Sequence, residues 1–407
     1  MSTVIPKGYK QTKVGVIPED WDIVNLGDVG KVVTGLTYSP ENIDKDGVLV
    51  LRSSNIQERK LSFNDNVYVN ISTLKFNPVK ENDILICVRN GSKSLIGKNA
   101  LIDKQNEGVA FGAFMSVYRS KYNSFMFQLF DTKVYKREVH RNLGATINSI
   151  NGSDLKKFRI PFPPQKEQQK IAQILASWDK SITIQEMLIK AKVQLKKGLM
   201  QKLLSGKVRF HGFSNEWEEV GLNKVLFHNS RPVDKPKEGY WKLGLRSHAK
   251  GTFHTFVEDP ETVRMDTLYF VKENDLIVNI TFAWEHALAL ASIEDEGKLV
   301  SHRFPTYVFK SGYSPLFFKY LMMQPRFKYE LENISPGGAG RNRVMSKKDF
   351  LKLKVTVPTL KEQQKIAEAL TYADKEINLL KNELVALKEQ KRGLMQKLLT
   401  GEVRVNI

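Results

Sequence analysis

The sequence is poor in cysteine and contains no long apolar stretch. Cys87 is the only cysteine among 407 residues, so a disulfide framework and a thiolate metal site are both excluded. It follows the apolar run Ile84–Ile86, where a buried strand position is the simplest interpretation. No apolar run approaches the roughly 18 residues that a membrane-spanning helix needs. Residues 1–7 lack the apolar segment of a signal peptide, so we expect the chain to stay in the cytoplasm.

Patterns typical of catalysis and of metal binding are also missing. The seven histidines are scattered, with no pair at helical ligand spacing, so we expect no intrinsic metal site. There is neither a Gly-x-x-x-x-Gly-Lys phosphate loop nor a Gly-x-Ser-x-Gly nucleophile elbow. The glycine-rich segment Gly337–Arg341 does not follow a convincing strand. We therefore predict a chain with no catalytic residues and no cofactor of its own.

Acidic residues are fewer than basic residues. The chain has 63 lysines and arginines against 44 aspartates and glutamates, which gives a formal net charge of +19. A polyanionic partner is favoured, because each neutralised phosphate releases condensed counterions. Nucleic acid is the leading interpretation. A merely soluble basic surface and an anionic membrane surface are the alternatives.

The strongest pattern present is a repeat with an offset of 195 residues, as from 166 to 361. Lys166–Ala172 returns as Lys361–Ala367, and Gly198–Leu204 returns as Gly393–Leu399. Fainter echoes precede each copy, at Trp21 and Trp217, at Leu51–Ser53 and Leu245–Ser247, and at Val79–Asp83 and Val271–Asp275. The repeat predicts a tandem duplication of a variable domain followed by a nearly fixed helix.

Composition predicts the nature of the repeated parts. The variable domains, residues 1–163 and 207–357, contain short Val-, Ile-, Phe- and Tyr-rich runs bounded by Asn, Gly, Asp and Ser, which predict strands. Ser124–Val139 has a helical pattern, so each variable domain is predicted to be α+β. The fixed parts, residues 164–206 and 358–407, are predicted to be two long spacer helices, the second with a C-terminal tail.

The spacer helices carry a heptad pattern that predicts a coiled coil. In the second copy the apolar seam is Ile366, Leu370, Ala373, Ile377, Leu380, Leu384, Leu387, Leu394 and Leu398, interrupted by Lys391. The first copy places Gln185, Lys192 and Lys196 on the same seam, and its extra apolar residues Met187, Leu188 and Leu195 suggest a broadened or shared interface. The alternative is that each helix packs only on its own domain.

Size predicts the direction of the two helices. A helix of about 40 residues is about 60 Å long, whereas a domain of about 150 residues is only about 40 Å across. In a parallel coil the second domain would have to carry the chain back along the whole coil. We therefore predict an antiparallel coiled coil that separates two pseudo-symmetric α/β domains.

Two domains on one spacer would contact two short blocks of a DNA duplex. Lysines and arginines would contact phosphates, and Arg, Asn, Gln, Ser and Thr side chains would contact base edges. For any single residue, a solvated surface group is the alternative. In the first domain the candidates are Arg52, Ser53, Asn55, Arg89, Asn90, Lys93, Thr146, Asn148 and Asn151, and in the second they are Arg246, His248, Arg303, Arg341, Asn342 and Arg343.

Several motifs carry a resemblance to a known family. They are Gly15–Trp21 followed by Leu26–Val29, the strand entry Glu81–Leu85, the segment Ile160–Ala172 and the segment Gly198–Phe210, and most of them recur in the second half. In this order, and present twice, they resemble the DNA-specificity subunit of type I restriction-modification enzymes. The resemblance covers essentially the whole chain.

The resemblance implies two target recognition domains, each reading one half of a bipartite DNA site, with the coiled coil setting the gap. It implies docking of two methyltransferase subunits that carry S-adenosylmethionine, and of restriction subunits that use ATP and Mg. The chain itself would be non-catalytic. Thr281–Glu285 replaces the basic stretch Arg89–Gly91, so the resemblance carries no contact role to it. The alternatives are a stand-alone two-headed DNA-binding or architectural protein and a single-chain nuclease or methyltransferase.

Docking is assigned to the repeated helices, because two copies of one partner need two equivalent surfaces. The candidate contacts are Glu167, Gln168, Gln169, Lys170, Glu362, Gln363, Gln364 and Lys365. The alternative is an ordinary charged first turn of a helix. Replacing this block in both copies is expected to abolish assembly and to leave the fold intact.

Overall fold

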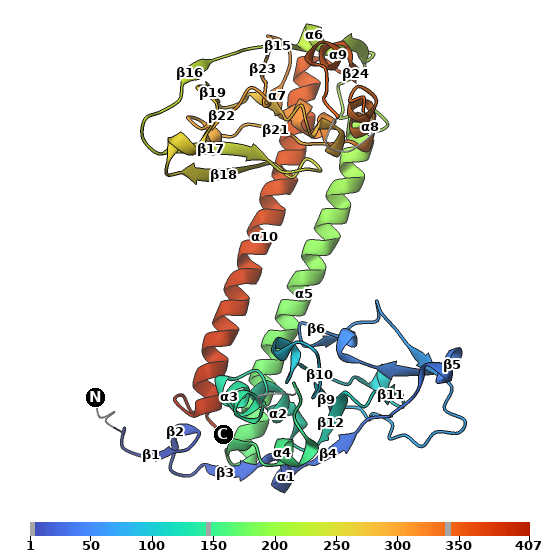
Figure 1. The fold of residues 1–407 in the computed structure, drawn as a ribbon, viewed down its shortest axis with the longest axis vertical. Helices are drawn as coiled ribbons and strands as arrows, with labels where there is room; N and C mark the ends of the chain where they lie inside the picture. The colour runs from blue at the N-terminus through green and yellow to red at the C-terminus, as the bar shows by residue number, and fades with distance from the viewer. Residues whose placement is uncertain (1–4, 144–147, 338–342) are drawn as a thin grey trace. The chain divides into compact units, whose positions relative to one another are not determined.

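The computed structural model describes residues 5–143, 148–337 and 343–407. The chain divides into two compact units, the first formed by residues 1–186 and 382–407 and the second by residues 187–381. Each unit therefore combines a variable domain with parts of both long helices (Figure 1). No helix within the described ranges is long and apolar enough to cross a membrane.

The described part of the first unit contains a four-stranded sheet, a three-stranded sheet and three two-stranded pairs, β1-β2, β6-β7 and β3-β13. Its four-stranded sheet has the antiparallel order β10-β9-β12-β4, and a second sheet has the order β11-β5-β8. Its strands are β1 (Tyr9–Thr12), β2 (Gly15–Pro18), β3 (Asp22–Asn25), β4 (Lys31–Thr34), β5 (Ile43–Leu51), β6 (Ile56–Gln57), β7 (Lys60–Leu61), β8 (Tyr68–Val69), β9 (Ile84–Cys87), β10 (Asn99–Leu101), β11 (Ala110–Phe111), β12 (Met115–Arg119) and β13 (Arg159–Phe162). Its short helices are α1 (Leu26–Val29), α2 (Asn123–Leu129), α3 (Lys133–Asn142) and α4 (Gly152–Lys156).

The helical pattern predicted for Ser124–Val139 is divided between α2 and α3. Thr132 interrupts it, because its hydroxyl donates to Leu129 O at 2.7 Å and accepts from Tyr135 N at 3.4 Å, and so caps α3. Cys87 is fully buried at the end of β9, in line with its apolar neighbours. The prediction of helical structure in this segment is therefore confirmed, as two helices, and that of a buried strand at Cys87 is confirmed as well.

The second unit repeats this framework. Its four-stranded sheet β15-β23-β20-β21 has the arrangement of β4-β12-β9-β10, and β14-β24 corresponds to β3-β13. Its strands are β14 (Glu218–Gly221), β15 (Leu226–His228), β16 (Pro232–Asp234), β17 (Tyr240–Leu245), β18 (Thr252–Val257), β19 (Thr267–Phe270), β20 (Leu276–Val278), β21 (Leu288–Leu290), β22 (Leu299–Val300), β23 (Thr306–Phe309) and β24 (Lys354–Val357). Its short helices are α6 (Leu222–Val225), α7 (Pro315–Met322), α8 (Pro325–Asn333) and α9 (Lys347–Lys352), and a five-stranded sheet has the order β16-β19-β22-β17-β18.

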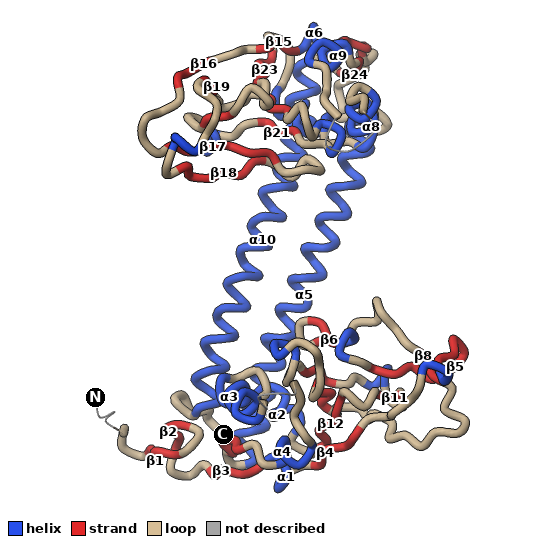
Figure 2. Tube along the Cα trace, in the orientation of Figure 1, coloured by secondary structure: helices blue, strands red, loops and turns tan. Residues whose placement is uncertain are grey.

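The two long helices are α5 (Gln165–Leu204) and α10 (Leu360–Thr400), both continuous in Figure 2. Prolines lie directly before α5 and two residues before α10, a placement that suits a helix start. Each helix is followed by a glycine in the left-handed region, Gly206 with φ +69° and Gly401 with φ +73°. This conformation is typical of helix C-termini and favours glycine.

The contacts of α5 with α10 within each unit have an antiparallel order. The ion pairs are Asp179–Lys391 and Glu186–Lys388 in the first unit, and Lys192–Glu376 and Lys196–Asp374 in the second. As the residue number rises along α5, the number of the α10 partner falls. The start of α5 also shares one core cluster with the end of α10, and the end of α5 shares another with the start of α10. The antiparallel prediction is confirmed.

The predicted seam lies between the helices, but its middle is polar. Ile171 and Leu175 are buried in the first unit, and Ile366 and Leu370 are buried in the second. The predicted polar seam residues of α5 are half-buried, and Lys192 and Lys196 form ion pairs there. The extra apolar residues Met187, Leu188 and Leu195 are exposed by 67%, 39% and 66%. They do not broaden the contact between α5 and α10, and that expectation is corrected.

Candidate nucleic-acid interface

Three sequence-predicted segments of the first unit converge at one end of its four-stranded sheet. The loop after β9 carries Asn90, whose amide Nδ2 donates to Ser53 Oγ at 3.2 Å. Asn90 N donates to Asn148 O at 3.2 Å, and Asn148 Nδ2 donates to Gly91 O at 2.8 Å. The loops at residues 52–55, 88–93 and 148–151 therefore form one surface, which we call the first loop cluster.

The two arginines of the first loop cluster differ in exposure and in whether an acidic side chain already neutralises their charge. Arg89 is exposed and its guanidinium lies 5.2 Å from the centre of the Phe114 ring. Arg52 is paired with Asp65 at 2.9 Å, so part of its charge is already neutralised. Phe114 is 57% exposed and was missed from the sequence. The signal that could have identified Phe114 as a contact is its position just before β12, which is equivalent to the position of the predicted contact Arg303.

Asn55 was predicted as a base contact, but it has a structural role. The side chain is fully buried, and its Nδ2 donates to Ser62 O at 3.0 Å and to Asp65 O at 3.2 Å. Its Oδ1 accepts from Arg52 N at 2.9 Å. Both ends of the amide are therefore engaged within the chain, and the interpretation of Asn55 as a base contact is corrected.

The second unit brings its predicted segments together in the same way. His248 N donates to Glu285 O and Ala249 N donates to His286 O, both at 2.8 Å. Ser247 Oγ is hydrogen-bonded to the Glu285 carboxylate. The loop at residues 279–286 thus lies against the loop at residues 246–251, and we call this surface the second loop cluster.

The remaining predicted residues of the second domain join this cluster from two sides. Ile280 N donates to Arg303 O at 3.0 Å, which places the exposed Arg303 beside the central loop. Arg343 lies with its guanidinium 5.2 Å from the Trp284 ring, although it also donates to Ser335 O and Glu332 O. Arg246 stands 5.3 Å from the centre of the Phe253 ring.

Other predicted contact residues are exposed at the edges or fall outside the description. Lys93 and Asn151 are exposed in the first loop cluster. His248 is exposed in the second, with a left-handed φ of +61°. Thr146, Arg341 and Asn342 lie outside the described residues.

One backbone hydrogen bond is present in both units, and it shows which residues of the two clusters are equivalent. Val88 N donates to Phe114 O at 3.0 Å in the first unit, and Ile280 N donates to Arg303 O at the same distance in the second. The buried acids that open the central strands, Asp83 and Asp275, have the same spacing from these donors. By this register Asn90 corresponds to Phe282 and Phe114 corresponds to Arg303.

The helix starts that were predicted as partner contacts are largely internal. Glu167 is fully buried and accepts two hydrogen bonds from Arg404, at 2.7 and 2.9 Å, and one from Trp21 Nε1 at 3.0 Å. Arg404 also bonds Asp20 with two hydrogen bonds. Hydrogen bonding to Glu167 and Asp20 raises the pKa of Arg404, and the same contact lowers the pKa of Asp20.

The second unit has the equivalent clamp with fewer bonds. Glu362 is buried and accepts from Arg209 at 2.9 and 2.6 Å. The buried Nε1 of Trp217, the counterpart of Trp21, has no hydrogen-bond partner among the described residues. In both units the acid opens one long helix and the arginine follows the end of the other.

These contacts correct the predicted docking block. Gln168 and Gln363 are buried as well, and their Nε2 atoms donate to Pro163 O and Pro358 O. Replacing them together with the two buried glutamates would disturb the fold, contrary to the expectation that it would stay intact. The exposed members of the block are Gln169, Lys170, Gln364 and Lys365.

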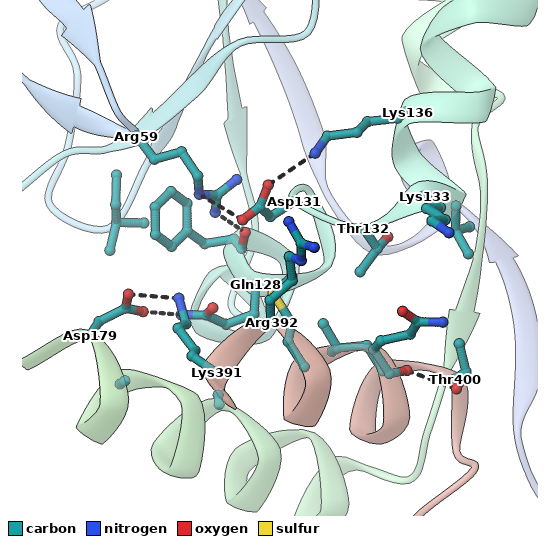
Figure 3. A pocket seen from close by; sticks show the side chains of 18 of the residues that line it. Arg59, Gln128, Asp131, Thr132, Lys133, Lys136, Asp179, Lys391, Arg392 and Thr400 are labelled. Carbon is teal, nitrogen blue, oxygen red and sulfur yellow. Dashed lines mark hydrogen bonds and ion pairs between the residues drawn. The ribbon is translucent and has the colours of Figure 1, made fainter. Parts of the chain in front are cut away.

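A cavity of about 1300 Å³ lies beside the helix pair in the first unit (Figure 3). Ile182, Met395 and Leu399 contribute apolar surface to it. Its cations are largely paired, since Lys391 bonds Asp179 at 2.6 Å and Lys136 bonds Asp131 at 3.2 Å. This mixed lining suits a protein segment better than a phosphate, because a phosphate needs unpaired positive charge.

Among the described residues no group of three or more His, Cys, Asp or Glu side chains could hold a metal ion. Burial raises the pKa of the Cys87 thiol, which disfavours the reactive thiolate. The two loop clusters therefore remain the candidate sites, with surfaces suited to binding.

A family model matches most of the chain. The model of the type I restriction modification DNA specificity domain matches residues 18–195 and 250–389. These two matches include the loops of both clusters except residues 246–249, and large parts of both long helices.

Relatives and solved structures give the same picture. The chain is 25% identical to the type I restriction enzyme MjaVIII specificity subunit of Methanocaldococcus jannaschii, covering 96% of this chain and 94% of the relative. It is 30% identical to the type I restriction enzyme EcoKI specificity subunit of Escherichia coli, over 48% of this chain and 44% of the relative. In fold it is similar to the crystal structure of the S subunit of a type I restriction-modification system from M. genitalium. That match has a TM-score of 0.56 and 17% identity, and covers 93% of this chain and 96% of the other.

Proposed function

The chain belongs to the family of type I restriction-modification DNA-specificity subunits, and from this premise we propose that each loop cluster reads one half of a bipartite site in double-stranded DNA. One observation carries the proposal. Equivalent loops converge on equivalent sheets in both units, but the side chains at equivalent positions differ, as at Asn90 and Phe282. A constant framework with variable contacts is suited to reading two different sequences.

Charged and neutral side chains of each cluster would have different roles in binding DNA. Exposed cations such as Arg89, Lys93 and Arg303 would contact phosphates and fix the register of the domain on the duplex. Asn90 and Asn148 are engaged within the cluster, since Asn90 Oδ1 accepts from Ser92 N at 3.0 Å and each Nδ2 donates one bond. Unlike Asn55 they are not fully buried, and the second hydrogen of each Nδ2 can donate to a base edge in the major groove. The net charge of +19 agrees with a phosphate-rich partner.

The antiparallel helix pair would set the gap between the two half-sites. Its contacts are specific in register, because Asp179 with Lys391 and Asp374 with Lys196 are the same pair in the two repeats. A fixed register gives a spacer of fixed length. The family membership does not favour a stand-alone architectural protein.

Two methyltransferase subunits would dock on the helix pair, one at each repeat. Gln169 and Lys170 in one copy, and Gln364 and Lys365 in the other, give two equivalent exposed surfaces. The exposed Met187 and Leu195 and the cavity beside α10 are further surfaces suited to protein contacts.

The chemistry would reside on the partners. S-adenosylmethionine would be carried by the methyltransferase subunits, and ATP and Mg by restriction subunits that join the complex. The chain itself would be non-catalytic and would act in the cytoplasm.

Methylome sequencing tests the proposal directly. Cells that express this chain with its companion methyltransferase subunit should gain methylated adenines in one bipartite motif with a constant gap. Cells that express the methyltransferase alone should lack that motif. Methylation that is unchanged by this chain, or that falls in a single uninterrupted motif, would contradict the proposal.

A further inference from the structure

The second loop cluster contains an aromatic surface that the predicted contacts leave unexplained. Phe282, in the loop after β20, is 42% exposed, and Phe253 on β18 is 39% exposed. Both line a hollow of about 690 Å³ together with Ser247 and Glu285. The aromatic side chains thus lie beside the loops that carry the candidate contacts Arg246 and His248.

The surface is held in place by its neighbours. Phe253 pairs with Gly244 across β17 and β18. Its ring occupies the space that a side chain at residue 244 would need, because a Cβ atom added there would lie 2.3 Å from the nearest ring atom. Arg246 lies 5.3 Å from the centre of the same ring. The loop that carries Phe282 is tied by Phe282 N to Asn279 O at 3.1 Å and by Glu285 N to Phe282 O at 3.0 Å. The Phe253 ring and the backbone that carries Phe282 are therefore held by contacts within the chain.

The equivalent position in the first loop cluster has the opposite chemistry. There Asn90 presents an amide bonded to Ser53. In the second cluster a phenyl ring stands in its place, and Ser247, the counterpart of Ser53, is bonded to Glu285 instead. An amide can hydrogen-bond to a base edge, whereas a phenyl ring can offer only apolar contact.

We propose that the second domain reads a thymine through its C5-methyl group, with Phe282 as the contacting side chain at the hollow that Phe253 also lines. The thymine methyl is the apolar group among the base edges of the major groove, and apolar side chains recognise it by contact. Arg246, beside the Phe253 ring, is placed to contact a neighbouring phosphate. The inference rests on the proposed function, since it names the chemistry of one half-site.

The test uses the purified complex with the methyltransferase subunit and duplexes that carry the motif found by methylome sequencing. The half-site read by residues 207–357 is identified by exchanging that domain. Each thymine of this half-site is then replaced by uracil, which lacks only the methyl group. At one position affinity should fall by about threefold to tenfold, the worth of one buried methyl contact. In the Phe282→Ala complex, thymine and uracil duplexes should bind equally.

Two control variants separate the outcomes. Asn90→Ala should weaken binding but keep the preference for thymine over uracil in the second half-site. Ile293→Ala, at a residue 65% exposed outside the cluster, should change neither. A half-site without thymine, uracil tolerated at every position by the unmodified complex, or a uracil effect that persists in Phe282→Ala would overturn the inference. A complex that methylates no bipartite motif would instead overturn the proposed function.

Discussion

The two clamps at the helix ends have the same design but different completeness. In the first unit Arg404 binds both Glu167 and Asp20, and Trp21 Nε1 donates to the same glutamate. In the second unit Arg209 binds only Glu362, and Trp217 Nε1 has no partner among the described residues.

The difference shows what the repeat preserves. The acid that opens one long helix and the arginine that follows the other are kept in both copies, so this cross-connection is common to both units. The outer partners differ between the copies, so they add stability to one unit alone. Arg404 follows α10 and is 237 residues away from Glu167 in the sequence. The first unit therefore depends on a segment that is distant in sequence from its own variable domain.

The largest expected effect comes from breaking the two clamps separately. Arg404→Ala leaves the fully buried Glu167 carboxylate with only the Trp21 bond, so the free energy of unfolding of the first unit should fall by about 2–3 kcal/mol. Arg209→Ala leaves the buried Glu362 carboxylate without its two hydrogen bonds from Arg209 and without an indole donor in their place, so it should destabilise the second unit by more. Hydrogen exchange measured by mass spectrometry on the full-length chain resolves the two units. Equal effects of the two variants would contradict the comparison.

The helix register provides the next test. Asp179→Lys places two cations together with Lys391 and should destabilise the first unit by about 1–2 kcal/mol. Adding Lys391→Asp should restore most of the loss, because the pair is rebuilt with its charges exchanged. Adding Lys196→Asp should not, because Lys196 pairs with Asp374. Thermal unfolding of the three variants measures these changes. Rescue by Lys196→Asp in place of Lys391→Asp would contradict the register.

Acid should act on the two units in different pH windows. Burial lowers the pKa of His286 below its ordinary value of 6.5, so below about pH 6.5 the unfolded state binds the proton first and the second unit loses stability. The bond to Arg404 lowers the pKa of Asp20 below its ordinary value of 3.8, so stability from this contact is lost only below that pH. Hydrogen exchange at several pH values should therefore show the second unit loosening first. His286→Gln should remove its acid step at pH 6.5, and loosening of the first unit before the second would contradict the assignment.

The smallest expected effect separates the two tryptophans. Trp21→Phe removes the indole donor from the buried Glu167 and should cost about 1 kcal/mol more than Trp217→Phe, whose Nε1 has no partner to lose. Trp21 is fully buried whereas Trp217 is half-buried, so the packing cost of the lost ring volume adds to the difference in the same direction. Denaturant unfolding curves measure the difference. A larger loss in Trp217→Phe would contradict the unequal clamps.

Much of the framework could be predicted because it depends on local patterns. Heptad spacing and the flanking prolines predicted a long helix within residues 358–407, and α10 spans Leu360–Thr400. Chain length and domain size were enough to predict the antiparallel direction. The candidates in residues 52–55, 88–93 and 148–151 were chosen separately from the sequence, and their convergence is a finding of the structure.

The errors arose where distant residues decide the environment. Glu167 and Gln168 have the composition of an exposed first turn, but Arg404 and Pro163 bury them. Asn55 resembles a base contact until its bonds to residues 62–66 are known. The offset that relates Glu167 to Glu362 also relates Arg209 to Arg404, and this was the signal for the clamps.

Domain exchange tests the central claim most directly. Residues 207–357 are replaced by those of a relative with a different second domain, and the adenine methylome is sequenced in cells that also express the methyltransferase subunit. The account predicts a new sequence in one half-site, with the other half-site and the gap unchanged. A change in both half-sites, or in the gap alone, would contradict the claim that each loop cluster reads its own half of the DNA site.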